Sequence, residues 1–154
     1  MVAIIRSHVI PAALSVLPPS MTSDQAIRML LAIGWQESRF QHRAQIGGPA
    51  KGFWQFEQGG GVVGVLGHER TKDIVRSAMR TLCYRDAPTP YGCHQAIRHN
   101  DVLACVFARL LLWTDWAPLP DDEAAGWQVY LRTWRPGKPH LETWPQAWAV
   151  GGSE

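Results

Sequence analysis

The stretch Ile33-Gly34-Trp35-Gln36-Glu37-Ser38-Arg39-Phe40 ends an apolar run and places a carboxylate on it. The apolar residues before Glu37 recur at the i, i+3, i+4 and i+7 spacing of one helix face, namely Ala26, Met29, Leu30 and Ile33. Ser23 or Asp24 can cap this helix, which we expect to run to about Phe40. Glu37 falls on the apolar stripe, where a charge is costly to bury. We therefore expect Glu37 to have a functional role.

Composition indicates a single globular domain over residues 1–154, with residues 1–22 as a segment that packs on it. The chain is 46% hydrophobic and 18% charged, which excludes a mostly disordered protein. Its formal charge of +2 is small and its basic residues are scattered, so no nucleic-acid surface is expected. A mild attraction to an anionic polymer is compatible with this charge.

Periodicity predicts a mainly α fold. A short helix over 2–17 should be broken at Pro11 and stopped by Pro18-Pro19. Further helices are expected over 68–82, over 95–116 as the central core helix, over 121–134, and as a short terminal segment over 141–148. The last residues, 151–154, should fray.

Residues 41–67 are rich in glycine and lack a long helical period. Glycine runs mark turns and close backbone approaches, and the only strands expected are short ones around 53–56 and 62–66. We therefore predict a small irregular β-element or glycine-rich flap around residues 47–67.

The eight tryptophans are the largest departure from average composition. Most are expected in the core, namely Trp113, Trp116, Trp127, Trp144 and Trp148. Three others are near the Glu37 stretch or a later aromatic segment, namely Trp35, Trp54 and Trp134. These three are candidates for a stacking surface.

No metal site or cofactor is expected. The histidines lack the spacing of a zinc helix and are predicted on the surface, namely His42, His68, His94, His99 and His140. The three cysteines, Cys83, Cys93 and Cys105, also lack metal spacing, so at least one thiol should be free, and a Cys83–Cys93 bridge stays open as an alternative.

No membrane span or secretory signal is expected. No stretch approaches the roughly 20 apolar residues that cross a bilayer. Near the N-terminus Arg6, His8 and Pro11 interrupt what would be the hydrophobic region of a signal peptide, and no small-residue cleavage site follows.

Glu37 has the setting of a general acid for glycosidic bonds. Burial on an apolar stripe raises a carboxyl pKa, and cleavage of a glycosidic bond needs a protonated acid beside a groove that grips several sugars. The aromatic residues expected to line such a groove are Trp35, Phe53, Trp54 and Phe56, with Gln55 holding hydroxyl or acetamido groups.

Two motifs carry a resemblance to a known family. Glu37-Ser38-Arg39-Phe40, followed by Gly52-Phe53-Trp54-Gln55-Phe56, resembles the Glu-Ser-x-Phe and Gly-Leu-Met-Gln-Ile motifs of soluble lytic transglycosylases and goose-type lysozymes. The resemblance covers about residues 24–137. It implies a lysozyme-like fold, a groove for peptidoglycan glycan strands, Glu37 as catalytic acid/base, and substrate contacts from Ser38 and from Gly52 to Phe56.

The third family motif, Ala-Tyr-Asn-x-Gly, is kept only in part, as Trp134-Arg135-Pro136-Gly137. Tyr130 or Arg135 is the expected substitute for its asparagine, with Trp134 as the aromatic contact. This divergence is similar to that of bacteriophage and prophage members. The resemblance then implies a bacteriolytic virion or endolysin-type protein, in the virion or host cytoplasm with action in the periplasm, and other phage proteins as partners.

Three functions follow as alternatives. A lytic transglycosylase cleaves the bond between N-acetylmuramic acid and N-acetylglucosamine with one glutamate, which we favour. A hydrolytic lysozyme needs a second carboxylate, for which Glu57 is the candidate. A non-catalytic wall-binding or virion structural module would keep the groove without cleavage.

Overall fold

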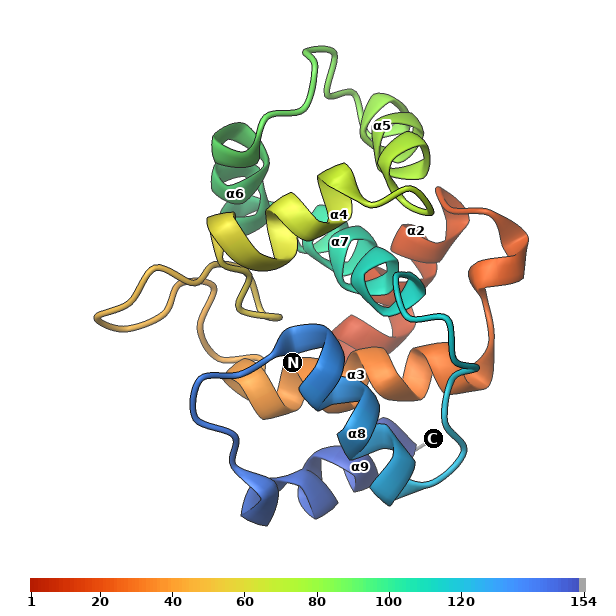
Figure 1. Ribbon diagram of the computed structural model, residues 1–154, viewed down its shortest axis with the longest axis vertical. Coiled ribbons are helices and arrows are strands. Elements are labelled where there is room, and N and C mark those ends of the chain that lie inside the picture. Colours follow the sequence, from red (N-terminus) through yellow and green to blue (C-terminus); the bar gives the residue numbers. More distant parts are fainter. Residues whose placement is uncertain (153–154) are drawn as a thin grey trace.

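The computed structural model describes residues 1–152, and these are mainly helical, as predicted. Figure 1 shows α7 running through the middle of the molecule, with α4, α5 and α6 on one side and α3, α8 and α9 on the other. The longer helices are α3 (Asp24–Ser38), α5 (Lys72–Thr81), α6 (Pro90–His99), α7 (Asp101–Trp113), α8 (Glu123–Trp134) and α9 (Trp144–Gly152). None of the described helices is both long and apolar enough to cross a membrane.

Helix α3 forms as its sequence predicts. The Ser23 hydroxyl accepts a hydrogen bond from the Ala26 amide at 3.1 Å and caps the helix. The helix ends at Ser38, because Arg39 and Phe40 adopt left-handed backbone angles. This ending leaves Glu37 in the last helical turn.

The predicted helix over 95–116 is two helices. Asn100 has extended backbone and its side chain caps α7 by accepting from the Leu103 amide at 3.0 Å. Helix α6 begins at Pro90, five residues before the predicted start, with Thr89 as its cap. Helix α7 is buried along most of its length and packs against helices on both sides of it, so the predicted central core helix is confirmed for residues 101–113.

The N-terminal segment passes through Pro11 without a break. It consists of α1 (Val2–Ile4), a π-helical segment (Ile5–Val9) and α2 (Ile10–Ser15). Pro11 lies in the first turn of α2, where its missing N–H and ring are tolerated directly after the wider π-helical turn. The prediction of a break at this proline is wrong.

The glycine-rich region contains less β-structure than predicted. Only two isolated bridges form, Ala44 with Lys51 and Lys51 with Phe56. Residues 58–67 are helical, as a π-helical segment (Gln58–Val62) followed by α4 (Val63–Gly67). The predicted strand over 62–66 is therefore wrong, because Val62 and Val65 face the core with helical spacing while Val63 is exposed.

The predicted helical C-terminal segment forms as a short 3-10 turn (Leu141–Thr143) and α9, and α9 packs along α3. Gly151 does not fray: it is buried against Arg28, and its carbonyl accepts from Arg6 at 2.8 Å. Gly152 is also helical. Residues 153–154 lie outside the described part.

Three smaller predictions need correction. Trp116 is exposed, not in the core, and Trp113 and Trp148 are only partly buried. His94 is buried, not at the surface. All three cysteines are free, so the alternative Cys83–Cys93 bridge is not formed.

Candidate active site

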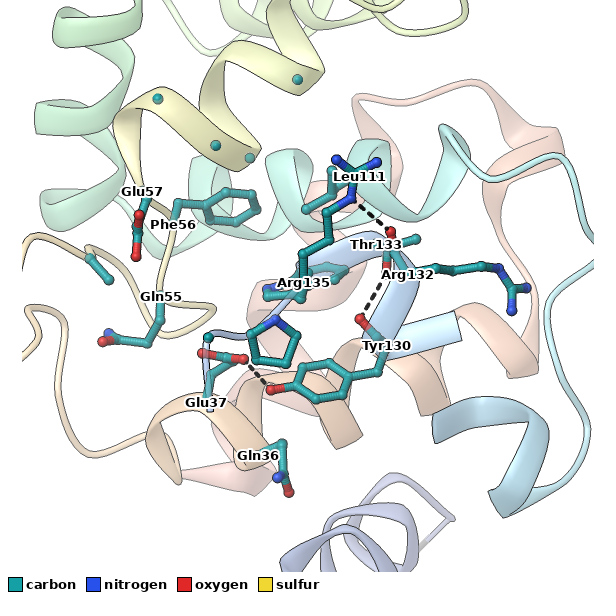
Figure 2. A pocket seen from close by; sticks show the side chains of 18 of the residues that line it. Gln36, Glu37, Gln55, Phe56, Glu57, Leu111, Tyr130, Arg132, Thr133 and Arg135 are labelled. Atoms are coloured by element: carbon teal, nitrogen blue, oxygen red, sulfur yellow. Dashed lines mark hydrogen bonds between the residues drawn. The ribbon is translucent and has the colours of Figure 1, made fainter. Parts of the chain in front are cut away.

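A groove of about 1090 Å³ lies between the two sides of the molecule. The ends of α3 and α8 and the residues after α8 form one wall, and residues from 45 to 64 form the other. Between them lie Leu111 of α7 and Thr114, the residue that caps the C-terminus of α7. Figure 2 shows Glu37 and Tyr130 on the first wall and Glu57 on the second. This volume is slightly above the roughly 300–1,000 Å³ of small-molecule pockets, which suits an oligomer.

Glu37 is held at the groove by Tyr130. The Tyr130 hydroxyl, from α8, donates a hydrogen bond of 2.7 Å to Glu37 Oε1. Burial raises the pKa of Glu37 to about 7, against the lowering effect of this hydrogen bond, and the nearby charge of Glu57 adds a smaller raising effect. Near neutral pH this carboxyl is therefore poised between donating and accepting a proton.

The end of α3 is fixed to the second motif by packing. A Cβ on Gly34 would collide with the ring of Phe40, so glycine is required for Phe40 to fold back on the helix. The Phe40 ring meets Phe53 and Trp54 edge-on, with centroids 5.7 Å and 5.8 Å away. The two motifs thus form one structural unit.

Hydrogen bonds complete this unit. Ser38 Oγ donates to the Phe53 carbonyl at 2.7 Å, and Trp54 Nε1 donates to the Leu30 carbonyl at 2.8 Å. Phe53 and Trp54 are fully buried, and Ser38 does not line the groove. The prediction that these three residues contact substrate is corrected: they position the backbone that carries Glu37 and Gln55.

Trp35 also lies outside the groove. It is buried on α3, and the Arg39 guanidinium covers its ring at 4.3 Å. Its predicted place in a stacking surface is therefore wrong.

Gly52 and Gln55 begin and end a tight turn, and of the two only Gln55 is placed where the predicted contact with substrate is possible. Gly52 has φ +73, and a Cβ there would lie 2.7 Å from Ile97, so glycine is needed for the turn and for packing, not for substrate. Gln55 does line the groove, and its amide donates to the Gly52 carbonyl at 2.8 Å. Of this pair, only the Gln55 side chain is available to a ligand.

The other predicted contacts lie at the groove. Phe56 backs it from the core, with Trp134 tilted against its ring at 6.0 Å. Trp134 Nε1 donates to the Trp54 carbonyl at 2.9 Å, which joins α8 to the second motif. Tyr130 and Arg135 also line the groove, Arg135 from the left-handed residue that ends α8.

Glu57 lies in the same groove as Glu37 in a different setting. It is exposed and makes no side-chain hydrogen bond or ion pair with the residues that the structure describes. Figure 2 shows its carboxylate on the wall below α4. The two carboxylates therefore share a groove, but only Glu37 is fixed by a neighbour.

The wall opposite Glu37 is made largely of glycine backbone. Gly59, Gly60, Gly61 and Gly64 all line the groove. A Cβ on Gly59 or Gly64 would meet no heavy atom within 4 Å, whereas one on Gly61 would lie 2.7 Å from Phe56. Internal packing therefore explains the glycine at 61 and leaves the glycines at 59 and 64 unexplained.

Sequence reasoning missed two features of the site. The first is His94, whose Nε2 lies 2.9 Å from the Phe56 carbonyl and supports the turn before Glu57; burial lowers its pKa. The second is a pair of further cations, Arg132 and Lys138, which line the same wall as the predicted Arg135, from the end of α8 and the loop after it. The closely spaced basic residues from 132 to 138 were the available signal.

No group of histidine, cysteine or acidic residues within 1–152 is arranged to hold a metal ion. Comparisons of the chain with protein-family models, with curated proteins and with solved structures find no match. The function therefore has to be argued from the groove itself.

Proposed function

We propose that this protein cleaves the β-1,4 bond between N-acetylmuramic acid and N-acetylglucosamine in peptidoglycan, with Glu37 as the catalytic acid and base. The observation that carries the proposal is the partly buried Glu37, hydrogen-bonded by Tyr130 and with a pKa of about 7, at the wall of an oligomer-sized groove. A carboxyl with these properties is the acid that glycosidic cleavage requires.

In the first step Glu37 donates its proton to the glycosidic oxygen as the bond from that oxygen to the muramyl C1 breaks. The Glu37 carboxylate then accepts the proton of the muramyl 6-hydroxyl as that oxygen bonds to C1. The products are a free 4-hydroxyl on N-acetylglucosamine and a 1,6-anhydromuramyl end. Glu37 regains its proton, so no second carboxylate is needed.

The rest of the groove fits an acidic glycan. Gln55 offers an amide for hydroxyl or acetamido groups, and the glycine wall leaves room for bulky sugar substituents. The cations Arg135 and Lys138 suit the carboxylates of the lactyl and peptide groups that peptidoglycan carries, whereas Arg132 is paired with Asp115. The resemblance of the two motifs to lytic transglycosylases supports the same substrate.

Hydrolysis is the second candidate, because Glu57 lies in the same groove and its charge raises the pKa of Glu37. A hydrolase must hold its second carboxylate to direct water or attack C1. Since no described side chain holds Glu57, we favour transglycosylation. A wall-binding module without catalysis would not require the raised pKa of Glu37.

The test is digestion of purified peptidoglycan with the full chain, followed by mass spectrometry of the fragments. We expect 1,6-anhydromuramyl ends. Reducing ends would replace transglycosylation with hydrolysis, and absence of any fragment would overturn the proposed cleavage.

A further inference from the structure

Trp116, in the loop after α7, has 73% of its side chain exposed. An exposed indole leaves a large apolar surface in water unless its face is used by a partner. Among the described tryptophans, the others are buried or partly buried. Trp116 therefore differs from the other tryptophans of this chain, because its ring is not part of the core.

The ring is held from one face. The Arg70 guanidinium lies over the Trp116 ring at 4.3 Å and also over Trp113 at 4.9 Å. Arg70 is fixed in turn, because its Nη1 donates to the Asp115 carbonyl at 2.9 Å. With Arg70 on one face and most of the side chain exposed, the other face is open to a ligand.

The backbone around Trp116 is fixed as well. The Asp115 carboxylate accepts from the Ala117 amide at 3.2 Å and from Arg132 Nε at 2.7 Å. These bonds fix the residues before and after Trp116 in the chain and connect Asp115 to α8. The indole is thus pre-organised, which lowers the entropy cost of binding on it.

The same contacts place Trp116 at one end of the groove. Arg132 and Thr114 line the groove, and Asp115 joins both of them to Trp116. On the other side His68 lines the groove and its Nδ1 accepts from the Arg70 amide at 3.1 Å. A strand leaving the groove here would meet the indole next.

We infer that Trp116 stacks on a pyranose ring of the glycan strand just beyond the groove. This inference rests on the proposed function, and it adds that the protein selects long strands over short fragments. The flat C–H face of a β-linked N-acetylhexosamine matches an open indole face whose other side is fixed by a cation. A protein partner on Trp116 is the competing occupant, and continuity with the groove favours the sugar.

The test measures binding by calorimetry in the full chain carrying Glu37→Gln, so that the ligand is not cleaved. The probes are chitobiose, chitohexaose, and peptide-free glycan strands from peptidoglycan. Trp116→Ala is compared with Trp116→Phe, which keeps a stacking ring, and with Tyr91→Ala, which removes another exposed aromatic that does not line the groove.

We expect Trp116→Ala to weaken binding of chitohexaose and long strands by about tenfold, and of chitobiose by less than about twofold. Trp116→Phe should restore most of the loss, and Tyr91→Ala should change nothing. Unchanged binding of the long probes, or an equal loss for both lengths, would overturn the inference and leave the proposed function standing. No binding of any probe, together with no cleavage by the unmodified protein, would overturn both.

Discussion

The two walls of the groove are built in opposite ways. The wall from α3 and α8 is backed by packed aromatic rings and holds Glu37 through the Tyr130 hydroxyl. The wall from residues 57–64 is exposed backbone with few side chains, and its carboxylate, Glu57, has no described partner. In the proposed function, the fixed wall therefore supplies the catalytic group, and the open wall provides room for the substrate.

The largest expected difference between the walls is that the charge of Glu37 lowers the free energy of unfolding, whereas the charge of Glu57 does not. Its pKa rises from 4.5 in the unfolded chain to about 7 in the fold, so the folded protein binds the proton more tightly. The contribution of protonated Glu37 to stability is therefore fully present below pH 4.5 and is lost as the pH rises to about 7. Glu37→Gln should raise the free energy of unfolding at pH 8 by on the order of 3 kcal/mol and change it little at pH 4.

Urea unfolding of both proteins at the two pH values measures this effect. Glu57→Gln is the matched control and should show no such gain at pH 8. An equal gain for Glu37→Gln at both pH values would mean that burial of the charge is not its cause.

The second-largest effect is expected from removal of the Tyr130 hydroxyl, which should change the pKa and the orientation of Glu37 on the fixed wall. In Tyr130→Phe the hydrogen bond that lowers the pKa of Glu37 is lost, so that pKa rises above 7. In the proposed mechanism activity needs protonated Glu37, so the alkaline fall of kcat/KM, expected near pH 7 in the unmodified protein, should move to higher pH. The maximum rate should fall about tenfold, since the carboxyl is no longer oriented.

A pH profile of peptidoglycan cleavage from pH 5 to pH 9 checks this expectation. If kcat/KM falls at the same alkaline pH in both proteins, a group other than Glu37 controls that fall. Tyr84→Phe, which changes a hydroxyl bonded to Asn100 outside the groove, is the control.

The open wall can be tested by adding one methyl group. Gly64→Ala should keep or raise stability by a few tenths to about 1 kcal/mol, because the site is helical and empty around the new Cβ. It should nevertheless weaken glycan cleavage several-fold, mainly through KM, because the methyl group enters the groove. Gly67→Ala is the matched control, since Gly67 is equally open but does not line the groove.

Kinetics and thermal unfolding of both alanine variants separate the two effects. Equal KM values for the Gly64 and Gly67 variants would show that substrate does not approach this wall.

The smallest effect is expected from Glu57→Gln. Because Glu57 is exposed and unheld, its loss should change the cleavage rate by less than about threefold. Glu69→Gln, on an exposed residue that does not line the groove, gives the background for such a change. A loss comparable to that expected for Glu37→Gln would instead assign Glu57 the second carboxylate role of a hydrolase.

Sequence reasoning could predict the elements with strong local signals. The period of α3 and its Ser23 cap are sufficient to place Glu37 on a buried stripe, and the apolar run of α7 indicates the central helix. The break at Asn100 was missed, although the polar residues 98–101 interrupt the apolar pattern and Asn100 is a favourable cap residue. Pro11 was misjudged because a π-helical turn absorbs it.

The site could be predicted only in part, because its contacts join distant residues. The spacing of two motifs pointed to Glu37 and Gln55, but spacing cannot distinguish an aromatic ring that lines a groove from one that packs beneath it. Phe53 and Trp54 are of the second kind. The Tyr130 hydrogen bond joins residues 93 positions apart and depends on how α8 packs against α3. The helical form of 58–67 depends likewise on burial of Val62 and Val65.

The most direct measurement is the rate of fragment release from one preparation of purified peptidoglycan by the unmodified protein, Glu37→Gln and Glu69→Gln. A general acid contributes roughly 10²- to 10⁴-fold, so Glu37→Gln should lose at least about 100-fold. Glu69→Gln should match the unmodified protein, and Glu37→Gln should still fold with the same circular dichroism spectrum. Equal release by Glu37→Gln and Glu69→Gln would contradict the role assigned to Glu37.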